Sequence, residues 1–112
     1  MYFNQLLLKE GYVVASIDNR SATAASRAHE TSVARRLWSD GELGDLVSGV
    51  HWLKAQPWVD PERIGVWGWS GGGMFTLVAL TRSKEFKAGI AVPPGTDWRF
   101  YDAKFTEAYM QP

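Results

Sequence analysis

The chain lacks cysteine, an excess of charge of either sign and long apolar runs. Without cysteine among its 112 residues, disulfide bonds and thiolate metal sites are excluded. Basic and acidic residues number 12 each, so the formal net charge is zero and nothing favours nucleic acid or an anionic membrane as a partner. No apolar run approaches the roughly 18 residues of a membrane span, and the first ten residues are too polar for a signal peptide.

The composition that remains is ordinary for one small globular domain, with 46% hydrophobic and 21% charged residues. We expect strands at Gly11–Ile17, Arg63–Trp67 and Ala88–Val92. Four helices are expected: Tyr2–Leu8, one from a capping box at Ser39 and Glu42 to Pro57, one from the turn after Ser70 to about Arg82, and Asp97–Met110. Residues 21–38 are expected to form a long, partly helical connection that contains no clear candidates for functional residues. The alternation predicts an α/β fold with a mainly parallel sheet, flanking helices and an active edge at the carboxyl ends of the strands.

The most informative motif is a Gly-x-Ser-x-Gly sequence centred on Ser70. It follows an expected strand and precedes an apolar run that suits a buried helix, which is the context of a nucleophile elbow. At such a turn the serine hydroxyl is lifted above the sheet, and Gly68 and Gly72 carry no side chains that would crowd it. The backbone N–H of Gly71, at the start of the helix, is a natural donor to an oxyanion. The alternative is a turn whose serine only caps the helix.

Beyond this motif, the chain resembles the catalytic domain of the prolyl oligopeptidase family from about Gly11 to Met110, most of all its dipeptidyl peptidase IV branch. The resemblance rests on four blocks, Trp58–Gly73, Phe86–Val92, Trp98–Asp102 and Glu107–Met110. It implies part of an α/β-hydrolase fold and a serine peptidase mechanism without cofactor or metal. Ser70 would be the nucleophile and Gly71 would donate one oxyanion hydrogen bond.

The resemblance also implies a substrate pocket. Trp98, Tyr101 and Phe105 fall where aromatic side chains surround the residue before the cleaved bond, commonly proline or alanine. At spacings i, i+3 and i+7 they would share one helical face, and flat rings suit a pyrrolidine ring. The same spacing also fits an ordinary core-facing stripe. Gly71 and Gly95 replace larger residues of familiar members, which would widen the pocket, and Trp67 and Trp69 could also shape it.

A complete catalytic triad is not expected within these residues. The α/β-hydrolase order places an acid and then a histidine after the serine, whereas His29 and His51 both precede Ser70. Asp97 and Asp102 follow the serine too closely to be the acid. We therefore expect residues 1–112 to be an incomplete catalytic domain. Its partners would be the rest of that domain, a β-propeller domain implied by the family, and a peptide substrate.

The sequence thus predicts a fragment of a serine peptidase that hydrolyses peptide bonds after proline or alanine, through an acyl-enzyme at Ser70. These residues alone are expected to be inactive. The uncovered edges of a partial sheet could also pair with another copy of the chain. Two alternatives stay open: another α/β-hydrolase, such as an esterase or acylaminoacyl peptidase, and a non-catalytic truncated hydrolase module.

Overall fold

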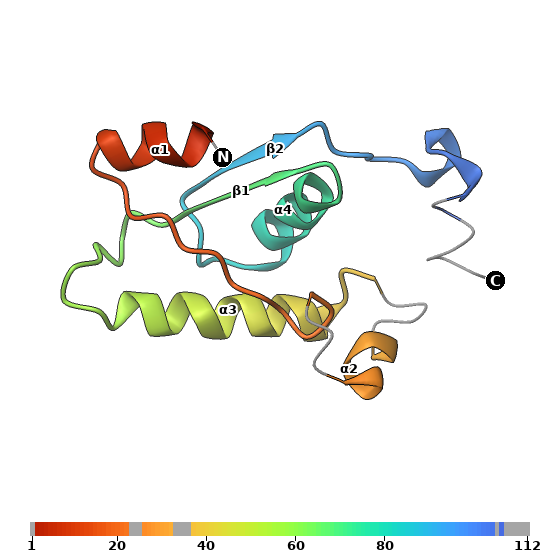
Figure 1. Ribbon diagram of the computed structural model, residues 1–112, viewed down its shortest axis with the longest axis horizontal. Helices are drawn as coiled ribbons and strands as arrows, with labels where there is room; N and C mark the ends of the chain where they lie inside the picture. The colour runs from red at the N-terminus through yellow and green to blue at the C-terminus, as the bar shows by residue number, and fades with distance from the viewer. Residues whose placement is uncertain (1, 23–25, 33–36, 105, 107–112) are drawn as a thin grey trace.

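Two parallel strands joined by a helix form the centre of the structure, a computed structural model that describes residues 2–22, 26–32, 37–104 and 106. Strand β1 (Gly65–Trp69) leads through helix α4 (Gly71–Arg82) into strand β2 (Ala88–Val92). The strands pair in parallel, and Trp69 lies opposite Val92 at the end of the ladder. Helix α4 packs against both strands (Figure 1). The β–α–β order and the parallel pairing confirm the predicted α/β fold class.

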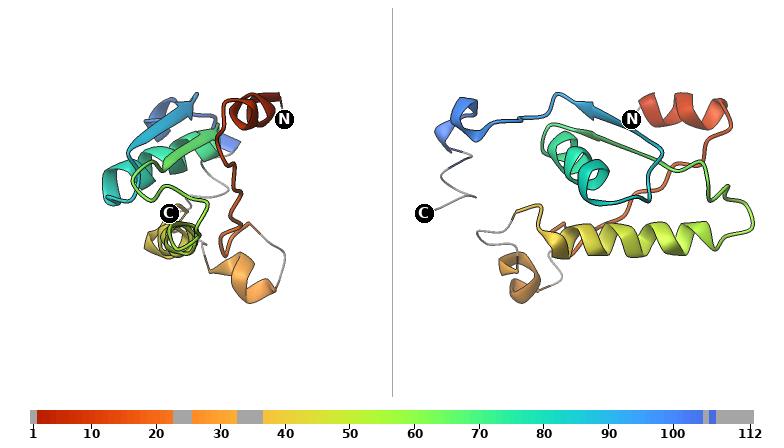
Figure 2. Two further views of the ribbon diagram at one scale, coloured as in Figure 1. Left: turned by 90° about the vertical axis from the view of Figure 1, so that its left-hand side faces the viewer. Right: turned by 180° about the vertical axis from the view of Figure 1, so that it is seen from behind.

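The remaining helices surround this unit. They are α1 (Tyr2–Lys9), α2 (Arg27–Thr31), α3 (Asp40–Lys54) and the short 3-10 helix η1 (Trp98–Phe100). Helices α1 and α4 lie on opposite sides of the strands (Figure 2). Helix α3 begins at the side of the molecule toward which both strands run (Figure 1). No helix in the described part of the chain is long and apolar enough to cross a membrane.

The start of α3 follows the predicted capping box. The carboxylate of Glu42 accepts a hydrogen bond from the backbone N–H of Ser39 at 3.0 Å, which satisfies a donor that the helix itself leaves unpaired. Two acidic residues in the first turn and Lys54 in the last turn complement the helix dipole. Leu43 and Val50 of this helix are buried, as the apolar spacing requires.

The strand predicted over Gly11–Ile17 is not present, and residues 12–19 have no regular secondary structure. The described sheet consists of β1 and β2, and neither is paired with this segment. An apolar, β-branched sequence favours extended backbone, but a strand also requires hydrogen bonds from a neighbouring strand. Tyr12 and Val13 are more than half exposed, while Ile17 is half-buried. The side chain of Ile17 presses on α3 at Gly49, where an added Cβ would lie 2.5 Å from the Cδ1 atom of Ile17.

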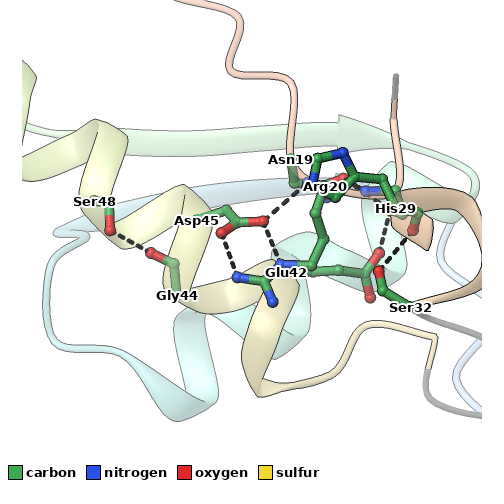
Figure 3. Close-up of polar contacts among 9 residues, drawn as sticks. Asn19, Arg20, His29, Ser32, Glu42, Gly44, Asp45 and Ser48 are labelled. Carbon is green, nitrogen blue, oxygen red and sulfur yellow. Dashed lines mark hydrogen bonds and ion pairs between the residues drawn. The ribbon is translucent and has the colours of Figure 1, made fainter. Parts of the chain in front are cut away.

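A polar cluster fastens the end of this segment to the first turns of α3 (Figure 3). Arg20 forms a bidentate ion pair with Asp45, with Nε–Oδ2 and Nη2–Oδ1 distances of 2.8 and 2.7 Å. These hydrogen bonds from Arg20 hold the pKa of Asp45 below its ordinary value. Beside them, the hydroxyl of Ser21 donates to the buried carboxylate of Glu42 at 2.5 Å. Charge-assisted bonds of this kind fix the loop relative to the helix.

Candidate active site

Ser70 occupies a sharp turn between β1 and α4. Its φ of 55° and ψ of −116° place it in a region that residues with a side chain rarely adopt. Its N–H donates to the carbonyl of Val92 at 2.6 Å, and its own carbonyl accepts from the N–H of Met74 at 3.1 Å. The sheet and the helix therefore hold the turn from both sides, and such restraint is what maintains a strained backbone. Ser70 itself is exposed.

The strand and the helix approach each other most closely at Gly68. A Cβ added there would lie 2.2 Å from the carbonyl oxygen of Gly72 and 2.3 Å from its carbonyl carbon, so no side chain fits. A Cβ added at Gly72 would meet no atom within 4 Å. The tightness of the turn thus depends on the missing side chain of Gly68 and on the backbone of Gly72.

The N-terminus of α4 offers free donors beside the serine. The first helical hydrogen bond is the one from Met74 to Ser70, so the N–H of Gly71 precedes the hydrogen-bonded part of the helix. The side chain of Ser70 makes no capping hydrogen bond, so the alternative of a purely capping serine lacks its defining contact. A positive helix end and an unpaired N–H next to a hydroxyl can stabilise negative charge that develops there.

A hollow of about 350 Å³ opens just past the carboxyl end of β2. Its wall begins one residue after Val92, the hydrogen-bond partner of Ser70, and consists of Pro93, Pro94, Gly95, Thr96, Asp97, Phe100 and Tyr101. The expected widening at Gly95 is offset within the chain. A Cβ there would lie 3.1 Å from Cδ2 of Tyr101 and 3.4 Å from the Met74 side chain, which together fill that space.

The helix predicted over Asp97–Met110 is interrupted. Trp98–Phe100 forms a short 3-10 turn, Tyr101 then has extended backbone with φ −97° and ψ 165°, and helical backbone returns at residues 103, 104 and 106, while residues 105 and 107–110 lie outside the described part of the chain. The carboxylate of Asp97 explains the short turn, because it accepts from the backbone N–H of Arg99 at 3.0 Å and pairs with its guanidinium. These contacts hold the pKa of Asp97 below its ordinary value. The carboxylate of Asp97 is therefore occupied by hydrogen bonds within its own turn.

Two of the three aromatic residues that were predicted to surround the pocket are nevertheless in contact. Trp98 and Tyr101 contact edge to face with ring centroids 6.0 Å apart, although they do not share a helical face. Phe105, the third, lies outside the described residues. The tryptophans beside the serine behave differently from each other. Trp67 packs edge to face on Phe3 of α1, 4.8 Å away, so it does not line the hollow, whereas Trp69 is 62% exposed next to Ser70.

Sequence reasoning missed Trp38, at the end of the irregular connection. Its ring stacks on Trp98 with centroids 5.4 Å apart and planes 9° from parallel. Its Cζ2 atom is 3.5 Å from the position that a Cβ on Gly71 would occupy. No periodicity marks this residue, and only the high tryptophan count of six hinted that such residues have a special use.

The side chain of His51 is engaged away from the serine. Nε2 of His51 lies 3.2 Å from Glu85, which also binds Lys54 at 2.6 Å. Glu85 follows the end of α4, while Ser70 precedes its start, and a 12-residue helix is about 18 Å long. His29 lies in α2, where its backbone N–H donates to Ser26. Among the described residues, no group of three or more histidine, aspartate or glutamate side chains could hold a metal ion.

The elements and the turn at Ser70 together define the class of protein. A parallel strand that passes through a serine of positive φ into a helix is the arrangement of α/β-hydrolases, and the described elements form a portion of that fold. The sequence model of the prolyl oligopeptidase family matches residues 1–112. The chain belongs to the prolyl oligopeptidase family.

Individual relatives agree with this assignment. A "Probable dipeptidyl-aminopeptidase B" of Grosmannia clavigera is 41% identical over 102 residues, which are 89% of this chain and 10% of that protein. The protein of the same name from Metarhizium robertsii is 41% identical over 103 residues, 90% of this chain and 11% of that protein. The crystal structure of Porphyromonas gingivalis dipeptidyl peptidase 4 superposes with a TM-score of 0.87 at 41% identity, over 96% of this chain and 15% of that one. The chain thus spans about a tenth of the length of these curated relatives.

Proposed function

We propose that these residues form the nucleophile-bearing part of a serine peptidase that releases dipeptides by cleaving after proline or alanine. The observation that carries the proposal is the strained turn at Ser70, which presents an exposed serine beside the N–H of Gly71 at the start of α4. Membership of the prolyl oligopeptidase family supports peptide hydrolysis. The names of the relatives, which describe dipeptidyl peptidases, support the release of dipeptides.

In the proposed reaction, Oγ of Ser70 attacks the carbonyl carbon of the scissile bond and gives its proton to a general base. The negative charge that forms on the carbonyl oxygen is stabilised by the N–H of Gly71. The carbon–nitrogen bond then breaks, the proton passes to the leaving amine, and the acyl group remains on Ser70 as an ester. A water molecule, deprotonated by the same base, hydrolyses this ester and restores the hydroxyl.

In this proposal, the general base and the acid that orients it come from residues of the full-length protein other than these 112. His51 and Glu85 contact each other beyond the far end of α4, so they cannot relay the proton of Ser70 without large rearrangement. The share of about a tenth that the chain covers in its relatives supports a longer functional protein. That protein would supply the remaining catalytic residues and, by the family resemblance, a β-propeller domain.

The hollow beyond β2 is the proposed binding site for the residue before the cleaved bond. Tyr101 lines it and Trp98 packs on Tyr101, so the site has rigid aromatic walls close to the turn at Ser70. Flat rings bury a pyrrolidine ring or a methyl group well and have little rotamer freedom to lose. Phe105 is proposed to complete this wall. The proposed mechanism uses no metal or cofactor.

The test uses the full-length protein and its Ser70→Ala variant. We expect a fluorophosphonate probe to label only the unmodified serine, and the variant to lose on the order of 10⁴-fold or more in kcat on a dipeptidyl anilide with proline before the anilide. Ser48→Ala is the matched control, because Ser48 is an exposed serine on α3 whose hydroxyl only donates to the carbonyl of Gly44. Equal labelling of Ser70→Ala and the unmodified protein would refute the nucleophile. Hydrolysis of simple esters without any action on anilides would instead refute the peptidase activity.

A further inference from the structure

Trp38 has an unusual backbone for its size. Its φ of 57° lies in the left-handed region, and Ser70 is the only other non-glycine residue in the described part of the chain with positive φ. A bulky residue keeps such a conformation only where its surroundings impose it, and such residues concentrate at functional sites. Trp38 directly precedes Ser39, the N-cap of α3, so the unusual backbone directs the ring just before the helix begins.

The ring of Trp38 connects two sides of the candidate site. On one side it stacks nearly parallel on Trp98, at a centroid distance of 5.4 Å. On the other side it reaches the space beside Gly71, where a Cβ would lie 3.5 Å from Cζ2, an ordinary contact distance. The chain enters α3 at the same side of the molecule where it leaves β2, which brings these distant segments together (Figure 1).

We propose that Trp38, which is not among the residues that line the hollow, adds a further wall to the substrate pocket between Gly71 and Trp98 and restricts the residue before the cleaved bond to compact side chains. Gly71 offers the oxyanion donor but no side chain, so the indole fills the space beside it. Through Trp98 the same ring also fixes the position of Tyr101, which lines the hollow. This assignment rests on the proposed peptidase function and adds a determinant of its selectivity.

The experiment measures kcat and KM of the full-length protein on dipeptidyl anilides that differ only in the second residue, proline, alanine or leucine. For Trp38→Ala we expect the ratio of kcat/KM for proline over leucine to fall by about 2- to 12-fold, mainly through KM for the proline substrate. This range corresponds to the ~0.5–1.5 kcal/mol of an aromatic pair. A loss of general stability would lower kcat/KM for both substrates by the same factor, whereas loss of a pocket wall changes the ratio of the two values.

Three further variants make the result specific. Trp38→Phe keeps a flat ring and should retain most of the proline preference. Trp38→Gly removes the ring but relaxes the positive-φ backbone, so it should lose the preference as Trp38→Ala does. Trp52→Ala is the control, because this tryptophan of α3 is 62% exposed and should leave the ratio unchanged. If Trp38→Ala does not fold, Trp38→Leu, which keeps apolar bulk without a stacking plane, takes its place.

The outcomes separate this inference from the proposed function. A proline-to-leucine ratio that stays within twofold in both ring-removing variants, while Ser70→Ala is inactive, overturns the role of Trp38 and leaves the peptidase proposal standing. Retained activity in Ser70→Ala overturns the peptidase proposal itself. A loss of preference in Trp38→Ala and Trp38→Gly that Trp38→Phe restores supports the assigned wall.

Discussion

Gly68→Ala is expected to impair catalysis without touching a reacting group. An added Cβ would lie 2.2 Å from the carbonyl oxygen of Gly72, whereas ordinary contact begins at 3.4 Å, so strand and helix must separate by about 1.2 Å. The clash is with backbone, which has no flexible end that could move aside. Because Ser70 lies between these two glycines, its hydroxyl must shift by a comparable distance. A misplacement of about 1 Å costs on the order of 10²-fold in rate, so we expect a loss of that size in kcat.

Gly72→Ala provides the comparison within the same motif. A Cβ there would meet no atom within 4 Å, and alanine suits a helical position better than glycine does. We therefore expect its loss in kcat to be at least tenfold smaller than that of Gly68→Ala. The assay is the initial rate on a proline-containing dipeptidyl anilide with the full-length protein, with circular dichroism to verify that both variants fold. Equal losses in the two variants would show that the close approach at Gly68 does not position the nucleophile.

Three further predictions concern the pocket, an ion pair and the isolated chain. Trp98→Ala should lower kcat/KM for the proline substrate by about tenfold or more, since it removes one ring from two aromatic contacts; an unchanged value would place the pocket elsewhere. Arg20 lowers the folded pKa of Asp45, so this carboxylate stabilises the fold above its unfolded pKa and loses that effect as pH falls through the folded value. Asp45→Asn should thus have a lower melting temperature than the unmodified protein at neutral pH, and this difference should shrink in acid. A difference that grew in acid would contradict the direction of the Asp45 pKa shift. The 112 residues alone should not hydrolyse the anilide, and turnover that depends on Ser70 would mean that they contain a base.

Local signals predicted the elements next to the serine well. The glycine and serine spacing predicted that a helix starts directly after Ser70, because steric limits at Gly68 act over only a few residues. The capping box predicted the start of α3, since Glu42 and Ser39 interact within one turn. Strand β2 matches its predicted bounds, and β1 is shifted by two residues from Arg63–Trp67 to Gly65–Trp69. Such shifts are normal where the pairing of a neighbour decides the limits of a strand.

Interactions between distant segments could not be predicted in this way. Residues 12–19 have a strand-like pattern, but a pattern does not state whether a neighbour is present to pair with it. The turn at Trp98–Phe100 depends on the bonds from Arg99 to Asp97, which compete with a continuous helix. The stacking of Trp38 on Trp98 joins an irregular segment to η1, and no periodicity encodes that contact.

The exposure of the sheet indicates where further protein would pack in the longer peptidase that we propose. Parallel sheets are normally covered on both faces, and α4 covers one face of β1 and β2. On the other face Trp67 is covered by Phe3 of α1, but its register partner Ile90 on β2 is 52% exposed. On that face, therefore, helix α1 covers β1 but leaves β2 exposed. The sheet needs additional elements on the β2 side, and strands added in parallel there would end at the same edge as Ser70. A base carried by the loop after such a strand could then reach the serine, which His51, in contact with Glu85 beyond the other end of α4, does not.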